Sequence, residues 1–418
     1  MLDLKYLREH QAEAETALLK RLKPEDFSLP QLFELDDQRK GIIIQVEKLK
    51  AERNQASKVK PDEATIRKMK VTGEEIKKLE DGLNKVEEEL KEKLSALPNL
   101  PAEDVRAGGK ENNEVVYTFG VQPQFDFQPK DHVELATKLG IIDYERAAKM
   151  SGSGFWLYKG AGALLEWALL NYFINHHTAN GYTFILPPFM LNEASAYASG
   201  HLPKFRDDLF WVQDGLCLNA TSEMMLGNYH RDEIIPEAEL PLKYFAYSPC
   251  FRREAGSYRQ EERGMIRGHQ FNKVEMFQYT KPEDSWTAFL ELRQSAEDLL
   301  RGLGLHFQTS QLAAADCSAA MAKTVDLEVW IPSMGIYKEV SSVSNALDYQ
   351  ARRGSMRFKS GKTNQNEFMH TLNASGLATS RLIPAILEQF QTADGSVVIP
   401  EVLRKYMPKQ MEKISSVG

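Results

Sequence analysis

Hydrophobic residues between positions 32 and 97 recur every three or four residues, with lysine and glutamate filling most positions between them. The first run comprises Leu35, Ile42, Val46, Leu49 and Ala56, and the second comprises Met69, Ile76, Leu79, Leu83, Val86, Leu90, Leu94 and Leu97. This spacing predicts an antiparallel two-helix coiled coil with its turn near Val59 to Glu63. At about 1.5 Å per residue, the longer helix should project on the order of 45 Å.

A different pattern begins after Pro98 and Pro101, which end the second helix and start a linker. Beyond about residue 119, strand-like runs cluster together instead of alternating regularly with helices, which favours an antiparallel sheet flanked by helices. Strands are expected at 182–189, 243–251, 265–279, 326–331 and 337–342, and helices at 163–177 and 283–300. We therefore predict an α+β protein with a helical arm (residues 1–103, coiled coil about 32–97), a linker (104–118) and a larger C-terminal domain (119–418).

The stretch from Phe251 to Phe277 combines alternating charge with aromatic residues. We interpret it as two antiparallel strands joined by a long loop, in which side chains share a face at every second position. That period places Arg252 and Glu254 on one face of the first strand, and on one face of the second it places Arg267, His269, Phe271, Lys273 and Glu275. Such a face could be a solvated surface with cross-strand ion pairs, or a floor for an anionic aromatic ligand such as a nucleotide.

Two polar pairs lie outside this stretch. Thr221 and Glu223 would share a face of a strand, or they would cap the start of a helix. Glu339 and Ser342 supply a carboxylate and a hydroxyl, which are hard oxygen ligands of the kind that Mg²⁺ uses beside nucleotide phosphates, although an ordinary edge strand explains them equally well.

A third group precedes the last predicted helix. Asn373 and Ser375 come directly before Gly376, and Arg381 falls in the first turns of the helix that follows. A helix N-terminus with an arginine attracts anions, but caps and exposed arginines are common at helix starts. This group therefore predicts either an anion site or a simple cap.

Charge narrows the possible partners. The 418-residue chain has a net charge of −7, which argues against general nucleic-acid binding and requires a local basic patch for any polyanion. One such patch surrounds the predicted turn of the coiled coil: Lys48, Lys50, Arg53, Lys58, Lys60, Arg67, Lys68 and Lys70. It is either a solvated face or a contact for the phosphate backbone of a folded RNA.

The remaining composition indicates the setting of the protein. The chain has no apolar run long enough to span a membrane and no signal-peptide pattern at its start, so we expect a cytoplasmic protein without a membrane partner. The three cysteines, Cys217, Cys250 and Cys317, are widely spaced, so we expect reduced thiols and no structural zinc.

Three segments resemble the motifs of class II aminoacyl-tRNA synthetases. GYTFILPPF resembles motif 1, FRREAG followed by GMIRGHQFNKVE resembles motif 2, and LNASGLATSRLIPAILEQF resembles motif 3. Together with the helical arm, they make the chain similar to the seryl-tRNA synthetase family of the common bacterial and organellar type, over nearly its whole length. The resemblance implies ATP-dependent activation of L-serine to seryl-adenylate and transfer of the seryl group to the 3′ end of tRNA(Ser), with tRNA(Sec) as a second candidate. It also implies ATP with Mg²⁺, a homodimer, and tRNA binding by the arm.

The same resemblance implies roles for individual residues. Around serine, the amino group would meet Thr221 and Glu223 beside Ser222, the carboxylate would meet Arg252, and the side chain would lie among Glu275, Asn373 and Ser375. Around ATP, adenine would stack on Phe271 and bond Glu254, and the γ-phosphate would meet Arg267 and Arg381. Mg²⁺ would bind Glu339 and Ser342, with Arg253, Val340 and Ser341 also in the ATP site. Arg252, Glu275 and Arg381 would be the catalytic residues.

Some positions depart from the family pattern. Arg253 stands where many relatives have serine, Ala374 replaces a glycine, and Ser380 adds an atom beside Arg381, which puts the geometry around Ser375 in doubt. No cysteine stands at a predicted serine contact, so the zinc-dependent archaeal form is not expected. The loop 255–264 is expected to be mobile until the tRNA acceptor end binds.

Two functions from other classes stay open at this point. One is an amino-acid ligase that loads a carrier protein, against which the full helical arm counts. The other is a non-catalytic RNA-binding or scaffold protein, against which the retained Arg252, Glu254, Glu275 and Arg381 count.

Overall fold

A computed structural model describes residues 1–57, 62–255 and 264–415 of the chain. It divides into two compact units, Met1–Leu100 and Pro101–Gly418, which are described here one at a time.

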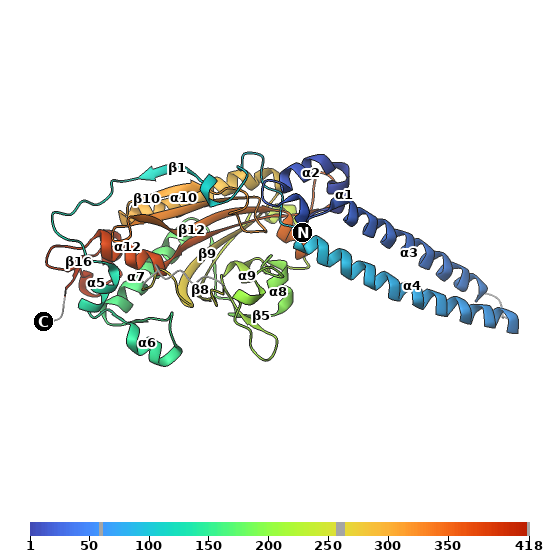
Figure 1. The fold of residues 1–418 in the computed structure, drawn as a ribbon, viewed down its shortest axis with the longest axis horizontal. Coiled ribbons are helices and arrows are strands. Elements are labelled where there is room, and N and C mark those ends of the chain that lie inside the picture. Colours follow the sequence, from blue (N-terminus) through green and yellow to red (C-terminus); the bar gives the residue numbers. More distant parts are fainter. Residues whose placement is uncertain (58–61, 256–263, 416–418) are drawn as a thin grey trace. The chain divides into compact units, whose positions relative to one another are not determined.

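The first unit is helical (Figure 1). Two short helices, α1 (Leu4–Glu9) and α2 (Gln11–Leu18), and a 3-10 turn (Pro24–Asp26) precede the long helices α3 (Leu29–Ala56) and α4 (Glu63–Ala96). Asp62 caps α4, because its carboxylate accepts a 2.8 Å hydrogen bond from the Thr65 amide. The two predicted long helices are confirmed, whereas most of the predicted turn near Val59 to Glu63 lies outside the described residues. The 34 residues of α4 correspond to about 50 Å of helix.

The buried stripe of the hairpin is the predicted one. Val46 and Ile76 are 6% and 4% exposed, whereas the apolar residues outside the repeat, Ile44, Ile66 and Val71, are all more than half exposed. The two helices therefore hold together through one narrow apolar seam, as the heptad spacing requires.

The second unit contains an eight-stranded sheet in the order β1-β10-β11-β12-β15-β9-β8-β4. These strands span Glu114–Phe119, Phe307–Gln311, Lys323–Ile331, Ile336–Leu347, His370–Ala378, Gln270–Thr280, Leu242–Phe251 and Thr183–Ile185, respectively. All neighbours are antiparallel except β4 and β8. The predicted α+β class and antiparallel sheet are confirmed.

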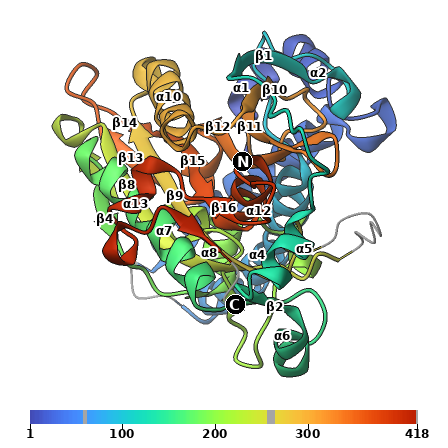
Figure 2. The same cartoon turned by 90° about the vertical axis from the view of Figure 1, so that its left-hand side faces the viewer.

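Three helices cover one face of this sheet: α7 (Ala161–Ala179), α10 (Ser285–Leu303) and α12 (Thr379–Gln389). Figure 2 shows α7 and α12 over the middle strands. Val274 and Met276 of β9 are fully buried in the core with these helices. The side chains that alternate with them, Lys273 and Glu275, therefore point to the other face, where the candidate site lies.

Several predicted strand boundaries are wrong. Arg252 and Glu254 lie beyond the end of β8, and Arg267 and His269 lie before the start of β9. The reason is visible at Glu254, whose φ of 53° is left-handed and cannot continue a strand. The predicted strand 182–189 shrinks to the three residues of β4, because the two prolines that follow have no amide to donate.

The alternatives for the two polar pairs are also resolved. Thr221 and Glu223 do not share a strand, since Glu223 begins the short helix α9 (Glu223–Leu226). Glu339 and Ser342 lie on β12, which is paired on both sides by β11 and β15 and is not an edge strand.

Candidate active site

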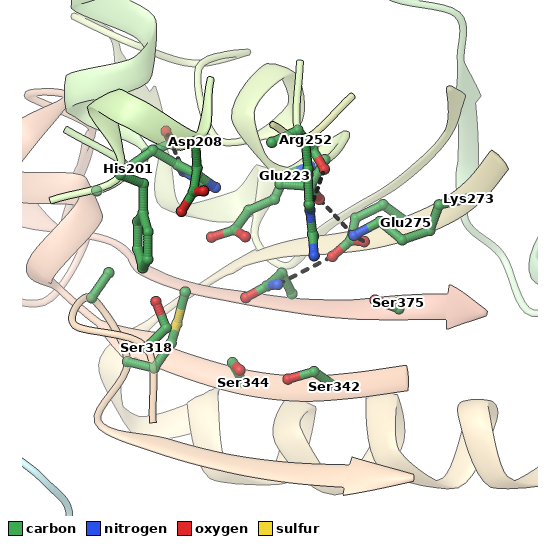
Figure 3. A pocket seen from close by; sticks show the side chains of 18 of the residues that line it. His201, Asp208, Glu223, Arg252, Lys273, Glu275, Ser318, Ser342, Ser344 and Ser375 are labelled. Carbon is green, nitrogen blue, oxygen red and sulfur yellow. Dashed lines mark hydrogen bonds and ion pairs between the residues drawn. The ribbon is translucent and has the colours of Figure 1, made fainter. Parts of the chain in front are cut away.

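A cavity of ≈ 370 Å³ lies on the face of the sheet opposite α7, α10 and α12. In Figure 3, Glu223, Arg252 and Glu275 extend into one side of it, and Ser318, Ser342 and Ser344 lie on the opposite side. The structure thus brings together residues that are more than 150 positions apart: Thr221, Glu223, Arg252, Glu254, Arg267, Glu275, Glu339, Ser342, Asn373 and Ser375.

A β-bulge explains how Glu339 and Ser342 reach the same cavity. Residues three apart in a regular strand point to opposite faces. In β12, Glu339 pairs with Glu328 and Ser341 pairs with Leu327, so that Val340 is one residue more than the partner strand has. The extra residue shifts the alternation and puts both side chains on the cavity side.

The buried end of the cavity is built around Glu275, whose side chain is fully buried. One carboxylate oxygen of Glu275 lies 2.5 Å from the Lys273 ammonium, and the other accepts a 3.1 Å hydrogen bond from the Asn373 amide. Lys273, itself 5% exposed, also donates to the Thr221 hydroxyl at 2.6 Å. Since a buried carboxylate needs a cation or several donors, the ammonium of Lys273 and the amide of Asn373 are the partners that compensate for its burial.

Glu223 is the second carboxylate of this end and is 8% exposed. Its Oε1 accepts a 2.7 Å hydrogen bond from the Gln350 amide, whose own oxygen accepts a 2.7 Å hydrogen bond from Thr371. Burial, with a smaller contribution from the nearby Glu275, raises the pKa of Glu223 to about 7. The buried end therefore offers two acidic groups to a small cationic ligand.

A second, smaller cavity of ≈ 50 Å³ adjoins the first, and both are lined by Arg252, Glu254 and Arg267. Its floor includes Phe271, and the Arg252 guanidinium lies over this ring at 5.2 Å from its centroid. A flat ring with a cation on its face is a suitable platform for a purine base. A base that stacked on the face of Phe271 that Arg252 covers would displace this guanidinium.

The arginines of this cleft are paired with carboxylates. Arg267 bonds Glu254 through Nε at 2.7 Å, while Arg381 donates to the Glu339 carbonyl at 2.7 Å and lies 3.4 Å from its carboxylate. Arg267, Arg381 and Glu339 also line a third adjoining cavity of ≈ 940 Å³. Arg252, Arg267 and Arg381 thus line the cavities that adjoin the acidic end.

Glu339 and Ser342 fit the predicted magnesium site. Both line the same cavity, and the Glu339 side chain is 43% exposed, so its carboxylate is accessible to a hydrated cation. No group of three or more His, Cys, Asp or Glu side chains with metal-site geometry occurs in the described residues. An Mg²⁺ ion held by Glu339 and Ser342 would therefore need phosphates and water as its other ligands.

Three predicted residues, Ser222, Arg253 and Ser341, do not line these cavities. The Ser222 hydroxyl bonds Ser248 at 2.6 Å, the Ser341 hydroxyl donates to the Ser375 carbonyl at 2.5 Å, and Arg253 is exposed. Val340 lines only the small cavity. The loop residues 256–263 lie outside the described residues, so the expectation of a mobile loop stays untested.

The substitution of Ala374 for glycine causes no strain in the structure. Ala374 is a regular residue of β15, paired with Met276 and Val343, and its φ is not positive. The positive φ of this segment, 85°, belongs to Leu377. The unusual backbone conformation of this segment therefore lies at Leu377, three residues after Ala374.

Sequence reasoning missed several residues that line the cavity or support it. Lys273 stood on the predicted strand face but was not assigned to the site, although a lysine two residues before a buried glutamate on one face was an available signal. His201, Asp208 and Gln350 come from loops and a short helix, where no periodicity predicts direction. Burial, followed by the nearby cations, lowers the pKa of His201 to about 3, so this imidazole is neutral.

The predicted basic patch lies on both long helices of the first unit. Lys48, Lys68 and Lys70 are exposed, whereas Lys50 and Arg67 pair with glutamates at 2.7 and 3.5 Å. Arg53 is half-buried, and Lys58 and Lys60 fall outside the described residues. Among the helices that are described, none combines the length and apolarity needed to cross a membrane.

Comparisons with known proteins cover the whole chain. Residues 1–101 match the model of the seryl-tRNA synthetase N-terminal domain, and residues 206–390 match that of the class II tRNA synthetase core domain (G, H, P, S and T). The chain is 56% identical to serine--tRNA ligase 2 of Clostridium acetobutylicum, covering 98% of this chain and 99% of the relative. It is 46% identical to serine--tRNA ligase of Geobacter sulfurreducens, covering 97% and 98%.

A solved structure agrees with these sequence matches. The crystal structure of seryl-tRNA synthetase from Pyrococcus horikoshii complexed with ATP superposes with a TM-score of 0.92 at 31% identity, covering 100% of both chains.

Proposed function

This chain belongs to the seryl-tRNA synthetase family, and we propose that it joins L-serine to tRNA(Ser) at the expense of ATP, through seryl-adenylate. The observation that carries the proposal is the juxtaposition in one cleft of a buried acidic end, formed by Glu223 and Glu275, with the arginines that lead away from it. The acidic end suits the ammonium and hydroxyl of serine, and the arginines suit the phosphates of ATP.

Serine binding follows from the charges of the buried end. The serine ammonium would lie between Thr221 and Glu223, and its carboxylate would meet Arg252. The hydroxyl would bond Glu275 within reach of Asn373, which already bonds that carboxylate. Alanine would leave these buried polar groups without a partner, and a site of this kind rejects an analogue that lacks the hydroxyl strongly.

ATP would bind in a bent form along the arginines. Adenine would stack on Phe271 with its amino group at Glu254, and the γ-phosphate would reach Arg267 and Arg381. The Arg267–Glu254 pair, joined at 2.7 Å, would loosen as the guanidinium turns to phosphate. Arg253, Val340 and Ser341 would flank the nucleotide, and Ser222 would support Thr221 and Glu223 through its bond to Ser248.

Glu339 and Ser342 would hold Mg²⁺. When bound there, the ion neutralises negative charge on the phosphates.

The chemistry requires positioning and charge stabilisation more than covalent help. A carboxylate oxygen of serine attacks the α-phosphorus in line, the bond to the β-phosphate oxygen breaks, and pyrophosphate leaves. Arg252 would stabilise the charge that develops on the α-phosphate. In the second step the 3′-hydroxyl of the tRNA attacks the seryl carbonyl, and AMP leaves with the electrons of the mixed anhydride bond.

The helical arm would bind the tRNA. Its exposed Lys48, Lys68 and Lys70 provide the sequence-independent phosphate contacts that this role requires. The expected substrate is tRNA(Ser), and tRNA(Sec) remains a second candidate.

A homodimer is supported by an apolar surface on the second unit. Leu164 and Trp167 of α7 are 41% and 54% exposed, and Leu186, just after the edge strand β4, is 69% exposed. Exposed aromatic and aliphatic side chains at a sheet edge are typical of a protein interface. We therefore propose that this surface mediates self-association.

Amino-acid-dependent exchange of pyrophosphate into ATP tests the proposal. The purified protein should catalyse exchange with serine and far less with alanine or threonine. Exchange with none of the twenty amino acids would refute the proposal and favour a non-catalytic RNA-binding protein. Exchange with serine but no charging of tRNA(Ser) would favour a ligase that loads a carrier protein.

A further inference from the structure

Glu166 is a buried carboxylate of α7 that the proposed chemistry does not use. It is 3% exposed and lies on the helix-covered side of the sheet, behind the active-site cleft. One of its oxygens, Oε1, accepts two hydrogen bonds, at 2.8 Å from the Asn272 amide and at 2.6 Å from the Thr379 hydroxyl. Burying a carboxylate costs folding free energy, so the presence of Glu166 at this position indicates a structural or functional role.

The two donors belong to the elements that carry the ATP site. Asn272 lies on β9 between Phe271 and Lys273, and Thr379 is the first residue of α12, two residues before Arg381. The same Thr379 hydroxyl oxygen lies 3.2 Å from the backbone carbonyl oxygen of Asn272, the second and more distant acceptor for its single proton. The carboxylate of Glu166 therefore fastens the strand that bears the adenine platform to the helix that bears a phosphate-binding arginine.

The orientation of Asn272 is itself fixed. Its side-chain oxygen accepts a 3.1 Å hydrogen bond from the Tyr247 hydroxyl, so that its NH₂ group faces Glu166. Burial raises the pKa of Glu166 to about 7, and the hydrogen bonds from Thr379 and Asn272 act in the opposite direction by favouring the ionised form. Both donors converge on Oε1 of Glu166, whereas its Oε2 is buried and has no hydrogen-bond partner among the described residues.

The segment that this network fastens is irregular. β15 pairs with β9 up to Ser375 and again at Ala378, so that Gly376 and Leu377 together lie opposite the single residue Val274, one residue more than β9 has. Leu377 has a left-handed φ of 85°, which is unfavourable for leucine and persists only where the surroundings enforce it.

Gly376 shows that α7 presses closely against this insertion. A Cβ atom on Gly376 would lie 2.3 Å from Nε2 of His177, which is also on α7 and is fully buried. Helix α7 thus supports the irregular segment on both sides of Leu377, through His177 below Gly376 and through Glu166 at Thr379.

We propose that Glu166 is a positioning residue for ATP, which acts by fixing the distance between Phe271 on β9 and Arg381 on α12. This inference rests on the proposed function, since it assumes that the adenine and the phosphates meet these two residues. Arg381 itself donates to the Glu339 carbonyl of β12 at 2.7 Å and to the Ile266 carbonyl at 3.3 Å, and neither of these contacts joins α12 to β9.

The test uses Glu166→Leu, which removes both acceptors, and Glu166→Gln, which keeps an oxygen for both donors. Thr379→Val removes one donor at nearly constant shape. The matched control is Glu388→Leu. Glu388 is a fully buried carboxylate on α12 that bonds His132 and Ser333 and does not line the cavities of the cleft. ATP affinity is measured by calorimetry, the KM values for ATP and serine by pyrophosphate exchange, and stability by thermal melting.

We expect Glu166→Leu to weaken ATP binding and raise the KM for ATP by tenfold or more, with the KM for serine changed less than threefold. Glu166→Gln should restore ATP affinity to within threefold of wild type. Thr379→Val should shift ATP affinity in the same direction, and Glu388→Leu should lower the melting temperature without changing the KM for ATP.

Two results would overturn the inference. One is wild-type ATP affinity in a folded Glu166→Leu protein. If that variant does not fold, the other is wild-type ATP affinity in Thr379→Val. Failure of the proposed function is separate, because it would appear as absence of serine-dependent exchange in the wild-type protein.

Discussion

The titration of Glu223 makes the affinity for serine depend on pH. Burial raises the pKa of this carboxyl to about 7, so that near neutrality a large part of the protein carries a neutral Glu223. The serine ammonium binds the ionised form, and the apparent affinity falls in proportion to the fraction that is ionised. For a carboxyl that titrates near 7, the KM for serine should rise roughly tenfold between about pH 7.5 and about pH 6, while the ammonium of serine stays charged.

The assay is pyrophosphate exchange at saturating ATP, with the serine concentration varied at each pH. Glu223→Gln is the matched control, because the amide keeps an oxygen for the 2.7 Å hydrogen bond from Gln350 but cannot ionise. It should bind serine about 10-fold to 100-fold more weakly, since a hydrogen bond to a charged group contributes about 1.5–3 kcal/mol. Its KM for serine should then be flat over the same pH range.

Two results would refute this reasoning. The first is a KM for serine that stays constant in the wild-type protein as the pH falls. The second is the same slope in Glu223→Gln, which would assign the titration to another group.

Three further predictions concern the buried ion pair, the arm and the dimer. Lys273→Met should destabilise the second unit by about 3–5 kcal/mol in urea unfolding, because it removes the cation that pairs with the buried carboxylate of Glu275. Lys413→Met, which breaks the exposed pair with Asp394, should cost much less. Equal losses of stability in the two variants would contradict the burial assigned to the Lys273–Glu275 pair. Lys68→Glu with Lys70→Glu should raise the KM for tRNA, most strongly at low salt, with pyrophosphate exchange unchanged; loss of both activities would show instead that the arm supports folding. Trp167→Glu should shift the sedimentation coefficient from dimer to monomer, and an unchanged dimer would place the interface elsewhere.

The parts of the fold that the sequence predicted well are those with long, regular periodicity. The heptad spacing from Leu35 to Leu97 predicted the helical hairpin because a seam of two helices leaves its pattern in every turn. Period-two alternation likewise placed Phe271, Lys273 and Glu275 on one face of β9, where the structure has them.

The sequence failed where backbone irregularity sets direction. Arg252 and Glu254 lie beyond the strand because Glu254 is left-handed, and Glu339 meets Ser342 only because Val340 forms a bulge. Neither feature changes the hydrophobic pattern, so no periodicity reports it. The supporting Gln350 was equally hidden, since its contact with Glu223 joins two short helices that are far apart in the chain.

The central claim is that one cleft binds serine at Glu223 and Glu275 and the nucleotide at Phe271. A crystal structure with a non-hydrolysable seryl-adenylate analogue tests it most directly. The account predicts the seryl ammonium at Thr221 and Glu223, the seryl hydroxyl at Glu275, and the adenine stacked on Phe271 with Arg252 moved off the ring. An analogue bound with its seryl group away from the two carboxylates, or with Arg252 still covering Phe271, would contradict the account.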